Sequence, residues 1–524
     1  MKTTLLILLF MIFGLNFQYG TSYKILMMFS SISPSHLIVA SGLLKGLTKY
    51  DHEVTMVSPF PQTKPTKPLK NYRDIVIPYN LNTDDWVTNL MKNAGSYWTS
   101  TKARLIFLKT LYELSNSTMS LPEFRKIMNE ESFDLVILGV PYGNYYFAGL
   151  AHHFNCPLIA LSHVQTTYLS TQLVGNPMNV ASSGHLYLGN VDGVMSFRER
   201  IINFLIVGME FLMIQYVRSL DRAYYESNFP PEKYPTYEEA IKKVSLLLVN
   251  NHVSQGAPRA NVPAIVEIGG VHIEGDANPL PDDLQEFLDN APNGVIFFSL
   301  GSNLKSSLLP EEQLNAIWKS FEMLQEKVLM KWETDQVPNI PSNVKIGKWL
   351  PQRDILAHKN LKVFVSHGAI GSITEARYWG VPIIGIPFFG DQMSNVAAAV
   401  KEGWAYQLNF DELTEESFSK ALQEVLSNPK YRNTVEKMAQ LYKDRPQTAL
   451  ETANYWIEYV IRHNGAPHLQ SHAVHLNFWQ NNSIDVIVFL IVTFYMIVKI
   501  SVIIIKLCWK MLKKNFTSRK DKQL

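Results

Sequence analysis

Cysteine is nearly absent from this chain of 524 residues, which contains only Cys156 and Cys508. The membrane topology predicted below places these two residues on opposite sides of a bilayer, so we expect no disulfide within the chain. A fold on the secretory side without disulfides must rely on a large packed core. The length and the hydrophobic content of 47% permit such a core and favour two domains of ordinary size.

An excess of charge of one sign is also missing. The 48 lysines and arginines and the 46 aspartates and glutamates give a formal net charge of +2 and are interleaved along the body of the chain. A protein that binds nucleic acid concentrates basic residues on one face, so we expect no nucleic-acid partner. No clear cluster of metal ligands stands out in the sequence, and we predict no metal site.

Glycine-rich phosphate loops are missing as well. The sequence holds neither a Gly-x-Gly-x-x-Gly turn nor a Walker-type loop. Dinucleotide-dependent oxidoreductase and ATP-dependent functions therefore lack their usual fingerprint. No internal repeat or low-complexity tract is evident.

The amino-terminal residues are typical of a secretory signal peptide. Lys2 is followed by an apolar run over residues 5–15 and by the small residues Gly20-Thr21-Ser22. We predict a signal peptide over residues 1–22. The alternative, a buried first strand, is disfavoured because residues 23–29 supply a strand immediately downstream.

A long apolar stretch over residues 484–505 predicts a transmembrane helix near the other end. At ~1.5 Å per residue it is about 33 Å long, enough to cross a hydrocarbon core of ~30 Å. Within it, Lys499 must reach the interface or face a partner helix. The tail over residues 506–524 is rich in lysine, which favours the cytosolic side. We therefore predict a single-pass type I protein in the lipid bilayer with a lumenal body.

The chain also carries signals that bear on its compartment. Residues 520–524 resemble a dilysine retrieval signal, so we expect the endoplasmic reticulum membrane as the location. The sequons at Asn116 and Asn481 would then be lumenal and glycosylated, whereas the sequon at Asn515 would face the cytosol and stay unmodified.

Apolar runs alternate with helical spacing in two parts of the body, which predicts two Rossmann-like halves with parallel sheets. The predicted strands cover residues 24–29, 53–58, 135–138, 158–162, 245–249, 294–300, 328–331, 344–348, 363–366 and 382–386. The predicted segments are an N-terminal domain over 23–250, a proline-rich linker over 251–293, a C-terminal domain over 294–465 and a juxtamembrane segment over 466–483.

Residues 201–217 are apolar enough to suggest a second membrane span. The stretch is short and contains Asn203, Glu210 and Gln215. These polar groups favour a helix that is buried or lies at an interface.

Residues 349–392 combine residue types that suit a nucleotide sugar. The apolar strand 363–366 is followed by a turn of small residues, 367–372, that opens a helix. Main-chain amides at such a helix N-terminus favour a diphosphate through hydrogen bonds and the helix dipole. The groups around this turn suit the rest of the ligand: Trp349 a base, Gln352 a base or ribose, Glu375 the ribose hydroxyls, and Asp391 and Gln392 the sugar hydroxyls.

Taken singly, these residues also fit ordinary structural roles. Trp349 would then belong to the core, Glu375 would lie on a solvated helix face, and His367 would be a loop histidine with its hydrogen bonds satisfied. The ordered combination distinguishes a nucleotide-sugar site from these alternatives.

The combination resembles the signature of the UDP-glycosyltransferase family, most closely its insect members. The matching residues are Trp349, Gln352, Ser366-His367-Gly368, Ser372, Glu375, Gly380-Val381-Pro382 and Gly390-Asp391-Gln392. The resemblance extends to residues 33–36, 52–60, 299–302 and 455–463, and so covers nearly the whole chain.

The resemblance implies an α/β architecture of the GT-B type, in which two Rossmann-like domains face each other across a cleft. It implies a hexosyltransferase that moves a sugar, glucose by analogy with insect members, from a UDP-sugar to a hydroxyl of a small lipophilic acceptor with inversion. The UDP-sugar is a co-substrate, and no cofactor is expected. Detoxification is among the roles that fit, and the sequence leaves homo- and hetero-oligomers open.

The resemblance also assigns site residues. His36 is the general base, a role that suits an imidazole with an ordinary pKa of ~6.5. The donor-binding set is Ser302, Trp349, Gln352, His367, Gly368, Gly371, Ser372, Glu375, Asp391 and Gln392.

The chain departs from the family pattern at two positions. The second glycine of the histidine turn is Ala369, and the carboxylate that orients the catalytic histidine is replaced by Gly139. Asp134 is no substitute, because five strand residues at ~3.3 Å each place it roughly 16 Å away. If the orienting group is missing, aspartate at position 139 should raise the rate. The alternatives are that His163 or a water fills the role, or that the equivalent position lies a few residues from Gly139.

Three hypotheses follow. The first is a lumenal sugar transferase. The second is a catalytically weak binding protein that retains the donor fold, and it is motivated by Gly139. The third, a Rossmann-type oxidoreductase, has no glycine fingerprint to support it.

Overall fold

The computed structural model describes residues 22–31, 33–62, 69–78, 97–140, 144–177, 179–185, 194–256, 258–335 and 340–520. The predicted signal peptide over residues 1–22 lies, apart from Ser22, outside this part of the chain. The chain divides into two compact units between Ser471 and His472.

The first unit contains a seven-stranded sheet in the order β3-β2-β1-β4-β5-β6-β7, and all its neighbouring strands are parallel. Its strands are β1 (Lys24–Met28), β2 (Glu53–Ser58), β3 (Tyr72–Val76), β4 (Leu135–Val140), β5 (Leu158–Ser162), β6 (Val244–Val249) and β7 (Ile265–Glu267).

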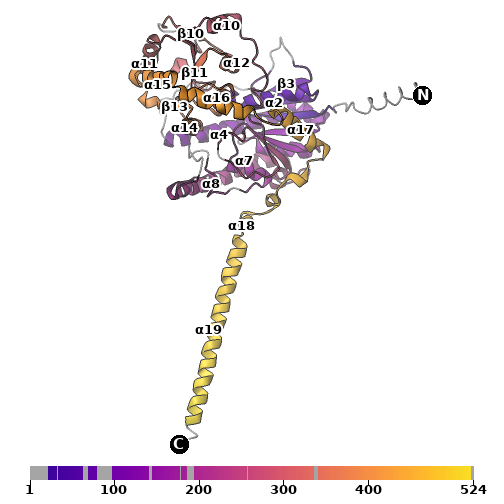
Figure 1. Ribbon diagram of the computed structural model, residues 1–524. Helices are drawn as coiled ribbons and strands as arrows, with labels where there is room; N and C mark the ends of the chain where they lie inside the picture. The colour runs from indigo at the N-terminus through magenta and orange to yellow at the C-terminus, as the bar shows by residue number, and fades with distance from the viewer. Residues whose placement is uncertain are drawn as a thin grey trace, which may run out of the picture. The chain divides into compact units, whose positions relative to one another are not determined.

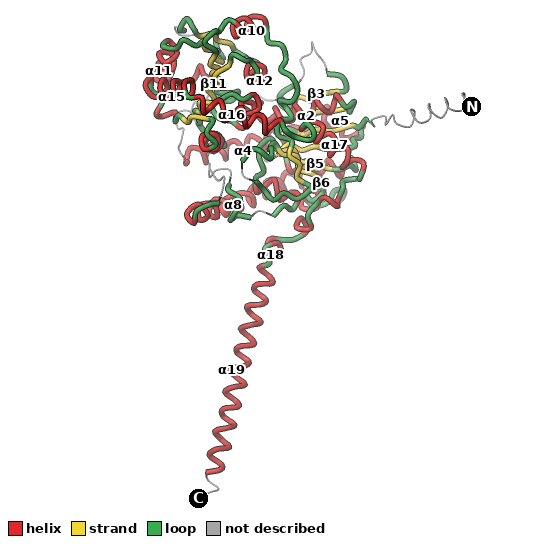
Figure 2. The backbone as a smooth tube through the Cα atoms, in the orientation of Figure 1, coloured by secondary structure: helices red, strands yellow, loops and turns green. Residues whose placement is uncertain are grey.

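The same unit contains a second parallel sheet with six strands, in the order β10-β9-β8-β11-β12-β13. Its strands are β8 (Val295–Ser299), β9 (Lys327–Lys331), β10 (Val344–Gly347), β11 (Leu361–Ser366), β12 (Ile383–Gly385) and β13 (Ala405–Gln407). The two parallel sheets confirm the predicted pair of Rossmann-like halves, and Figure 2 shows both with helices around them.

Helices connect these strands, as parallel pairing requires. Around the first sheet lie α2 (Ile38–Lys49), α4 (Tyr97–Ser120), α5 (Pro122–Glu130), α6 (Gly149–His153), α7 (Tyr168–Thr171), α8 (Phe197–Asn228) and α9 (Tyr237–Ile241). Later in the chain come α10 (Asp282–Asp289), α11 (Glu311–Glu322), α12 (Gln352–Leu356), α13 (Ile370–Trp379), α14 (Gln392–Lys401), α15 (Glu415–Ser427), α16 (Pro429–Lys443) and α17 (Ala449–Arg462).

The second sheet is buried on both faces, which explains why its strands are continuous apolar runs. In β8, Val295 and Phe297 belong to one core cluster, whereas Ile296 and Phe298 belong to the cluster on the other face. This alternation is the two-residue period of a strand.

The segment 251–293, predicted as a linker, contributes β7 to the first sheet and α10 to a core of the second. The predicted second domain runs to residue 465, and its last helix, α17, packs into the core of the first sheet. In Figure 1, α17 lies beside α2. Leu450 of α17 approaches α2 so closely that a Cβ added at Gly46 would lie 1.8 Å from its Cδ1.

Helix α8 contains the stretch that suggested a second span, and by length and composition it passes the same test as a membrane helix. It is joined to the first domain by buried polar contacts. Asn203 Nδ2 donates to the carbonyls of Val180 and Ser183, and Tyr112 donates to Asp221 Oδ1 at 2.8 Å. One face of α8 is therefore part of the first domain.

The second unit contains α18 (Phe478–Asn481) and the single long helix α19 (Ile484–Lys520). Residues 484–513 of α19 are long and apolar enough to cross a membrane and are not buried by protein. This candidate span agrees with the predicted transmembrane helix. The Nζ atom of Lys499 lies 5.4 Å from the ring centroid of Tyr495, one turn earlier.

In both sheets the strand order changes direction between two central neighbouring strands. These strands are β1 and β4 in the first sheet and β8 and β11 in the second. Ligands of open α/β sheets bind outside the carboxyl ends of the strands at such switch points. The segments after β1, β8 and β11 begin at residues 29, 300 and 367, and they include the predicted site residues His36 and His367.

Candidate functional site

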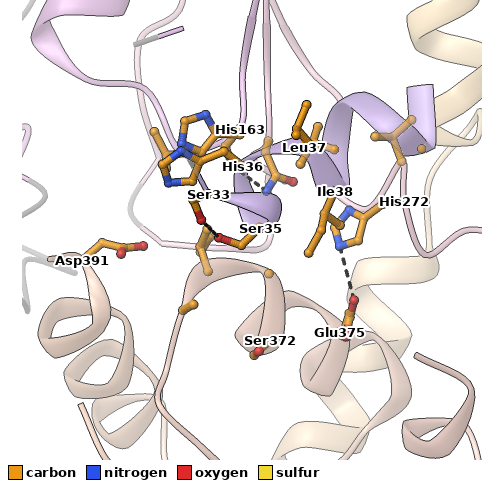
Figure 3. Close-up of a pocket in the computed structure, with 18 of the residues that line it drawn as sticks. Ser33, Ser35, His36, Leu37, Ile38, His163, His272, Ser372, Glu375 and Asp391 are labelled. Carbon is orange, nitrogen blue, oxygen red and sulfur yellow. Dashed lines mark hydrogen bonds and ion pairs between the residues drawn. The ribbon is translucent and has the colours of Figure 1, made fainter. Parts of the chain in front are cut away.

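A cavity of ≈ 1390 Å³ lies within the first unit, between loops of the two sheets. All but one of the predicted catalytic and donor-binding residues line it: His36, Ser302, Trp349, Gln352, His367, Gly371, Ser372, Glu375, Asp391 and Gln392. Figure 3 shows His36 and His163 on one wall, with Ser372, Glu375 and Asp391 on the opposite wall. Gly368 is the exception. A Cβ added at Gly368 would lie 2.3 Å from Cγ2 of Val396 in α14, so this residue packs against that helix.

The two domains meet at this cavity through the loops that follow β1 and β8. Ser33 Oγ donates to Asn303 Oδ1 at 2.9 Å. The contact joins the loop that carries His36 to the loop that carries Ser302, and so places the predicted base next to the predicted donor site.

The N-terminus of α13 opens into the cavity. Its N-cap residue, Ala369, has no side-chain oxygen and makes no capping hydrogen bond. A Cβ at Gly371 would meet no atom within 4 Å, so the space beside this turn is open. The main-chain amides and dipole of this turn form a place for an anion.

A carboxylate, an amide and a hydroxyl lie together beside this turn. Gln352 Nε2 donates to Glu375 Oε2 at 2.7 Å and to Ser372 Oγ at 3.2 Å. His272 Nε2 lies 3.9 Å from Glu375 Oε1. Burial raises the pKa of Glu375 to about 7 and lowers the pKa of His272 to about 4. His272 was not predicted from the sequence.

An exposed indole forms another part of the cavity wall. Trp349 is 76% exposed, which leaves its ring available to stack on a base. The Nζ atom of Lys331 lies 5.8 Å from its ring centroid and donates to Gly301 O at 2.6 Å. This arrangement suits Trp349 to hold an aromatic group at the rim.

His367 packs against the main chain of Gly301. A Cβ added at Gly301 would lie 2.5 Å from His367 Cε1, and its φ of +83° also favours glycine. Burial, with a smaller effect from Lys331, lowers the pKa of His367 to about 3. Among the described residues, its Nδ1 has no hydrogen-bond partner. The ring is therefore neutral, and its Nδ1 atom is available to make a hydrogen bond with a ligand.

Asp391 and Gln392 lie at the start of α14, and both also serve the local structure. Asn395 Nδ2 donates to Asp391 Oδ2 at 2.8 Å, and burial raises the pKa of this carboxyl. Gln392 Oε1 accepts from the amides of Phe388 and Phe389. These contacts fix the orientation of both side chains at the cavity wall.

The structure excludes the ordinary roles considered for three of these residues. Trp349 is exposed instead of belonging to the core, Glu375 is 7% exposed instead of solvated, and the His367 ring is not satisfied among the described residues. An exposed indole, a buried carboxyl and a ring nitrogen without a partner among the described residues are all features that suit a ligand site.

The predicted base, His36, follows the short 3₁₀ turn at Pro34–Leu37. Its Nδ1 lies 2.9 Å from Ser31 Oγ. Its ring stacks on His163 with centroids 4.1 Å apart and planes at 22°. Burial lowers the pKa of His36 to about 4 and lowers that of His163 well below its usual value, with His36 as a second cause. Both imidazoles are neutral at pH 7.

His163 does not orient His36 in the way that the sequence suggested. A ring stacked face to face presents no lone pair along the Nδ1–H direction of its neighbour, since hydrogen bonds lie in the ring plane. Ser31 makes the contact with Nδ1 instead. It was missed because a serine was not considered as a partner, although it stands five residues before His36.

The prediction that aspartate at position 139 could restore a missing carboxylate is contradicted by packing. A Cβ added at Gly139 would lie 2.4 Å from Phe29 Cδ1 and 2.5 Å from Phe29 Cε1. Phe29 is 3% exposed, so its ring has little room to move away. The ring occupies the space that a carboxylate at position 139 would need.

Both predicted glycosylation residues are exposed. Asn116 lies in the last turns of α4, and Asn481 is the last residue of α18. Within the described part of the chain, no group of three or more His, Cys, Asp or Glu side chains is placed to hold a metal ion.

Two Rossmann-like domains with a cavity at both switch points, one wall carrying a helix N-terminus and the other a histidine, define a glycosyltransferase of the GT-B class. Residues 24–522 match the family described as UDP-glucoronosyl and UDP-glucosyl transferase. The chain belongs to this family, and it is an enzyme that transfers sugar from a UDP-sugar to an acceptor.

Its relatives include insect and vertebrate enzymes. It is 35% identical to UDP-glucosyltransferase 2 of Dactylopius coccus, over 93% of each chain. It is 28% identical to UDP-glucuronosyltransferase 2B15 of Homo sapiens, again over 93% of each. A solved UDP-glucosyltransferase from Polygonum tinctorium has the same fold, with a TM-score of 0.55, 14% identity, and coverage of 84% of this chain and 99% of that one.

Proposed function

We propose that this protein transfers glucose from UDP-glucose to a hydroxyl of a small lipophilic acceptor, with inversion at the anomeric carbon. The observation that carries the proposal is the N-terminus of α13, whose N-cap residue makes no capping hydrogen bond and which faces the same cavity as His36. Glucose is supported by the Dactylopius coccus relative, which is named a UDP-glucosyltransferase.

In this proposal the donor lies along the C-terminal wall. The diphosphate accepts hydrogen bonds from the first turn of α13, with Ser302, Ser372 and His367 beside it. The uracil stacks on Trp349, and Glu375 with Gln352 binds the ribose. Asp391 and Gln392 contact the sugar. The helix dipole, which needs no metal or cofactor, favours the negative charge that develops on the leaving UDP.

The acceptor lies on the N-terminal wall, which is lined in part by Phe60, Val164 and Tyr168. The neutral imidazole of His36 accepts the proton of the acceptor hydroxyl as its oxygen attacks the anomeric carbon. The bond between this carbon and the phosphate oxygen breaks on the opposite face, which inverts the anomer.

The sequence signals at the two ends support a location in the endoplasmic reticulum membrane. In this proposal the predicted signal peptide and the candidate span in α19 leave the body in the lumen, with the basic tail on the cytosolic side. In that compartment the protein acts on lipophilic molecules, detoxification substrates among them.

The test is incubation of the purified full chain in detergent with labelled UDP-glucose and a panel of phenols. We expect a β-glucoside, identified by the coupling constant of its anomeric proton. Parallel reactions with UDP-glucuronic acid and UDP-galactose determine the sugar. An α-glucoside would contradict inversion, and faster transfer from another donor would contradict glucose.

A second candidate function is supported by Gly139, the position at which the family carries its orienting carboxylate. The protein would then bind the donor or a lipophile without efficient transfer. UDP binding with no transfer to any phenol of the panel would favour this function over the first.

A further inference from the structure

The hydroxyl of Ser31 is built into the loop that carries the proposed base. Ser31 is 7% exposed, and its Oγ lies 2.9 Å from His36 Nδ1. The same oxygen accepts from the amide of Ser33 at 3.3 Å and has the Ser33 carbonyl at 3.5 Å as an acceptor for its own proton. With that proton directed to the carbonyl, the oxygen can accept from an Nδ1–H group, which leaves the Nε2 lone pair of His36 to act as a base.

No acidic residue stands at either strand end that supports His36. Residues 25–50 and 135–191 contain neither aspartate nor glutamate. The end of β4 is also fixed in place, because Asn144 Nδ2 donates to Gly139 O at 2.8 Å while its Oδ1 accepts from the amide of Ser30. Together with the ring of Phe29 against Gly139, these contacts leave no room for a carboxylate at position 139.

The stacked neighbour of the His36 ring is another imidazole and supplies no negative charge. His163 lies face to face with His36, burial lowers the pKa of both rings, and His36 further lowers the pKa of His163. In a histidine–carboxylate pair, by contrast, the negative charge stabilises the imidazolium that forms when the base accepts a proton.

We propose that Ser31 is the positioning residue for His36. In consequence, this hydroxyl–imidazole pair transfers sugar efficiently to acidic hydroxyl groups, phenols above all, and poorly to aliphatic alcohols. The inference rests on the proposed function and deepens it. Ser31 fixes the orientation and the tautomer of the ring. A carboxylate would make His36 a stronger base and allow it to deprotonate weakly acidic hydroxyls; without one, the acceptor hydroxyl must itself be acidic.

The step balances without any further reactant. The acceptor O–H proton passes to His36 Nε2, the acceptor oxygen bonds to the anomeric carbon, and the carbon–oxygen bond to the diphosphate breaks with its electron pair on UDP. Nδ1–H remains on His36, donated to Ser31. A phenol, with a pKa of ~10, loses its proton to such a base far more readily than an alkanol, whose acidity is close to that of water at about 15.7.

The experiment measures kcat/KM for substituted phenols of graded acidity and for alkanols of similar size, with saturating UDP-glucose. We expect kcat/KM to fall as the acceptor pKa rises, with alkanols about 100-fold or more below phenols. Equal rates for alkanols and phenols would overturn the inference and leave the proposed function intact. Transfer to neither class would instead remove the proposed function.

Variants of the loop test the role of Ser31 directly. Ser31→Ala should lower kcat for phenols by about 3- to 10-fold, the effect of one hydrogen bond, without changing the KM for UDP-glucose. Ser31→Thr, which keeps the hydroxyl, should restore most of the loss. The matched control is Ser30→Ala, because the buried Oγ of Ser30 has no hydrogen-bond partner among the described residues.

The outcome is decided by comparison of these variants. A Ser31→Ala protein with wild-type kcat, or a Ser30→Ala protein with the same loss, would contradict a positioning role. If Ser31→Ala does not fold, Ser31→Thr and the acceptor series on the wild-type chain test the proposal. Ser31→Thr must then show the same dependence of kcat/KM on acceptor pKa as the wild-type chain.

Discussion

At the scale of single residues, the imidazole of His36 is defined by the groups around it. Ser31 lies at its Nδ1, His163 covers one face, and Phe29 fills the space beside Gly139. These contacts bury the ring and keep it neutral, which is the form that accepts a proton. The chemistry of the proposed base therefore follows from packing as much as from the histidine itself.

Removal of the base should stop transfer without loss of donor binding. His36→Ala is expected to lower kcat by about 100-fold or more, because general-base assistance is lost, while UDP affinity is unchanged. The measurement pairs steady-state rates with calorimetry of UDP binding. His152→Ala is the control, since His152 is exposed and does not line the cavity. A His36→Ala enzyme as fast as wild type would remove His36 from the mechanism.

The low pKa of His36 predicts an unusual acid limb. The group must be neutral to act, and burial lowers its pKa to about 4, so activity is lost only as the pH falls through about 4. With saturating donor, kcat/KM for the acceptor should stay level between about pH 5 and 8 on this account. Circular dichroism and UDP binding at each pH separate titration from unfolding. An acid limb near 6.5, the value of an unperturbed histidine, would contradict the burial seen here.

Aspartate at position 139 should not improve the enzyme. Gly139→Asp forces a side chain against the buried ring of Phe29, and overpacking of this kind costs about 1–3 kcal/mol before the buried charge is counted. We expect a lower melting temperature and no gain in kcat. Gly139→Ala tests the steric part alone and should be destabilised less. A faster, stable Gly139→Asp enzyme would show that Phe29 moves aside.

At the scale of elements, the N-terminus of α13 is the feature on which donor binding depends. The N-cap residue Ala369 contributes no capping side chain, and the helix faces open space at Gly371. The carboxyl of Asp391 accepts a hydrogen bond from the amide of Ile370 in the first turn. Burial lowers the pKa of His367 and raises the pKa values of Glu375 and Asp391, which shifts each group toward its uncharged form. This shift reduces the negative charge that would oppose a diphosphate at the positive end of the helix dipole.

A carboxylate placed on this helix should separate stability from binding. In Gly371→Asp the side chain has room, and a negative charge in the first turn of a helix is favourable, so the melting temperature should be unchanged or raised. The same charge repels a diphosphate, and UDP affinity should fall about 100-fold. Gly371→Ala is the uncharged control. Undiminished UDP binding by Gly371→Asp would place the diphosphate elsewhere.

Sequence patterns predicted the interior of both sheets but not all of their edges. Buried parallel strands are continuous apolar runs, and the interior strands β1, β2, β4, β5, β6, β8, β9, β11 and β12 were all predicted, along with the edge strand β10. The missed strands β3, β7 and β13 all lie at sheet edges. β3 is half exposed and carries Arg73 and Asp74, while β7 and β13 have three residues each. Short or polar edges give little periodic signal.

The same reasoning explains what was predictable in the site. The residues from Trp349 to Gln392 are close in sequence and form a recognisable order, and the structure brings them to one cavity. The contact between Phe29 and Gly139 joins two strands far apart in the chain, and that between His272 and Glu375 joins two domains. Packing of this kind leaves no local pattern.

At the scale of the whole molecule, the two domains of the first unit are joined at several places. Ser33 and Asn303 connect the catalytic loops, and Arg353 Nη2 of α12 donates to the carbonyl of Glu274 in the segment after β7. Because α17 packs into the first sheet, the chain passes from the donor domain back to the acceptor domain before it reaches α18 and α19. The two halves of the cavity are thus held by several independent contacts.

The proposed topology predicts which sequons carry glycan. Asn116 and Asn481 are exposed and should be modified in the lumen, whereas Asn515 follows the span and should not. The chain expressed in eukaryotic cells should shift on a gel after glycosidase treatment. Loss of the shift in Asn116→Gln/Asn481→Gln, but not in Asn515→Gln, is the expected result. A glycan on Asn515 would show that the tail is lumenal and would contradict the proposed orientation.

The most direct test of the central claim is titration calorimetry of the folded full chain with UDP and UDP-glucose. The account predicts saturable binding of both at one site, weakened by Gly371→Asp and unaffected by His36→Ala. A folded chain that binds neither UDP nor any UDP-hexose would contradict it.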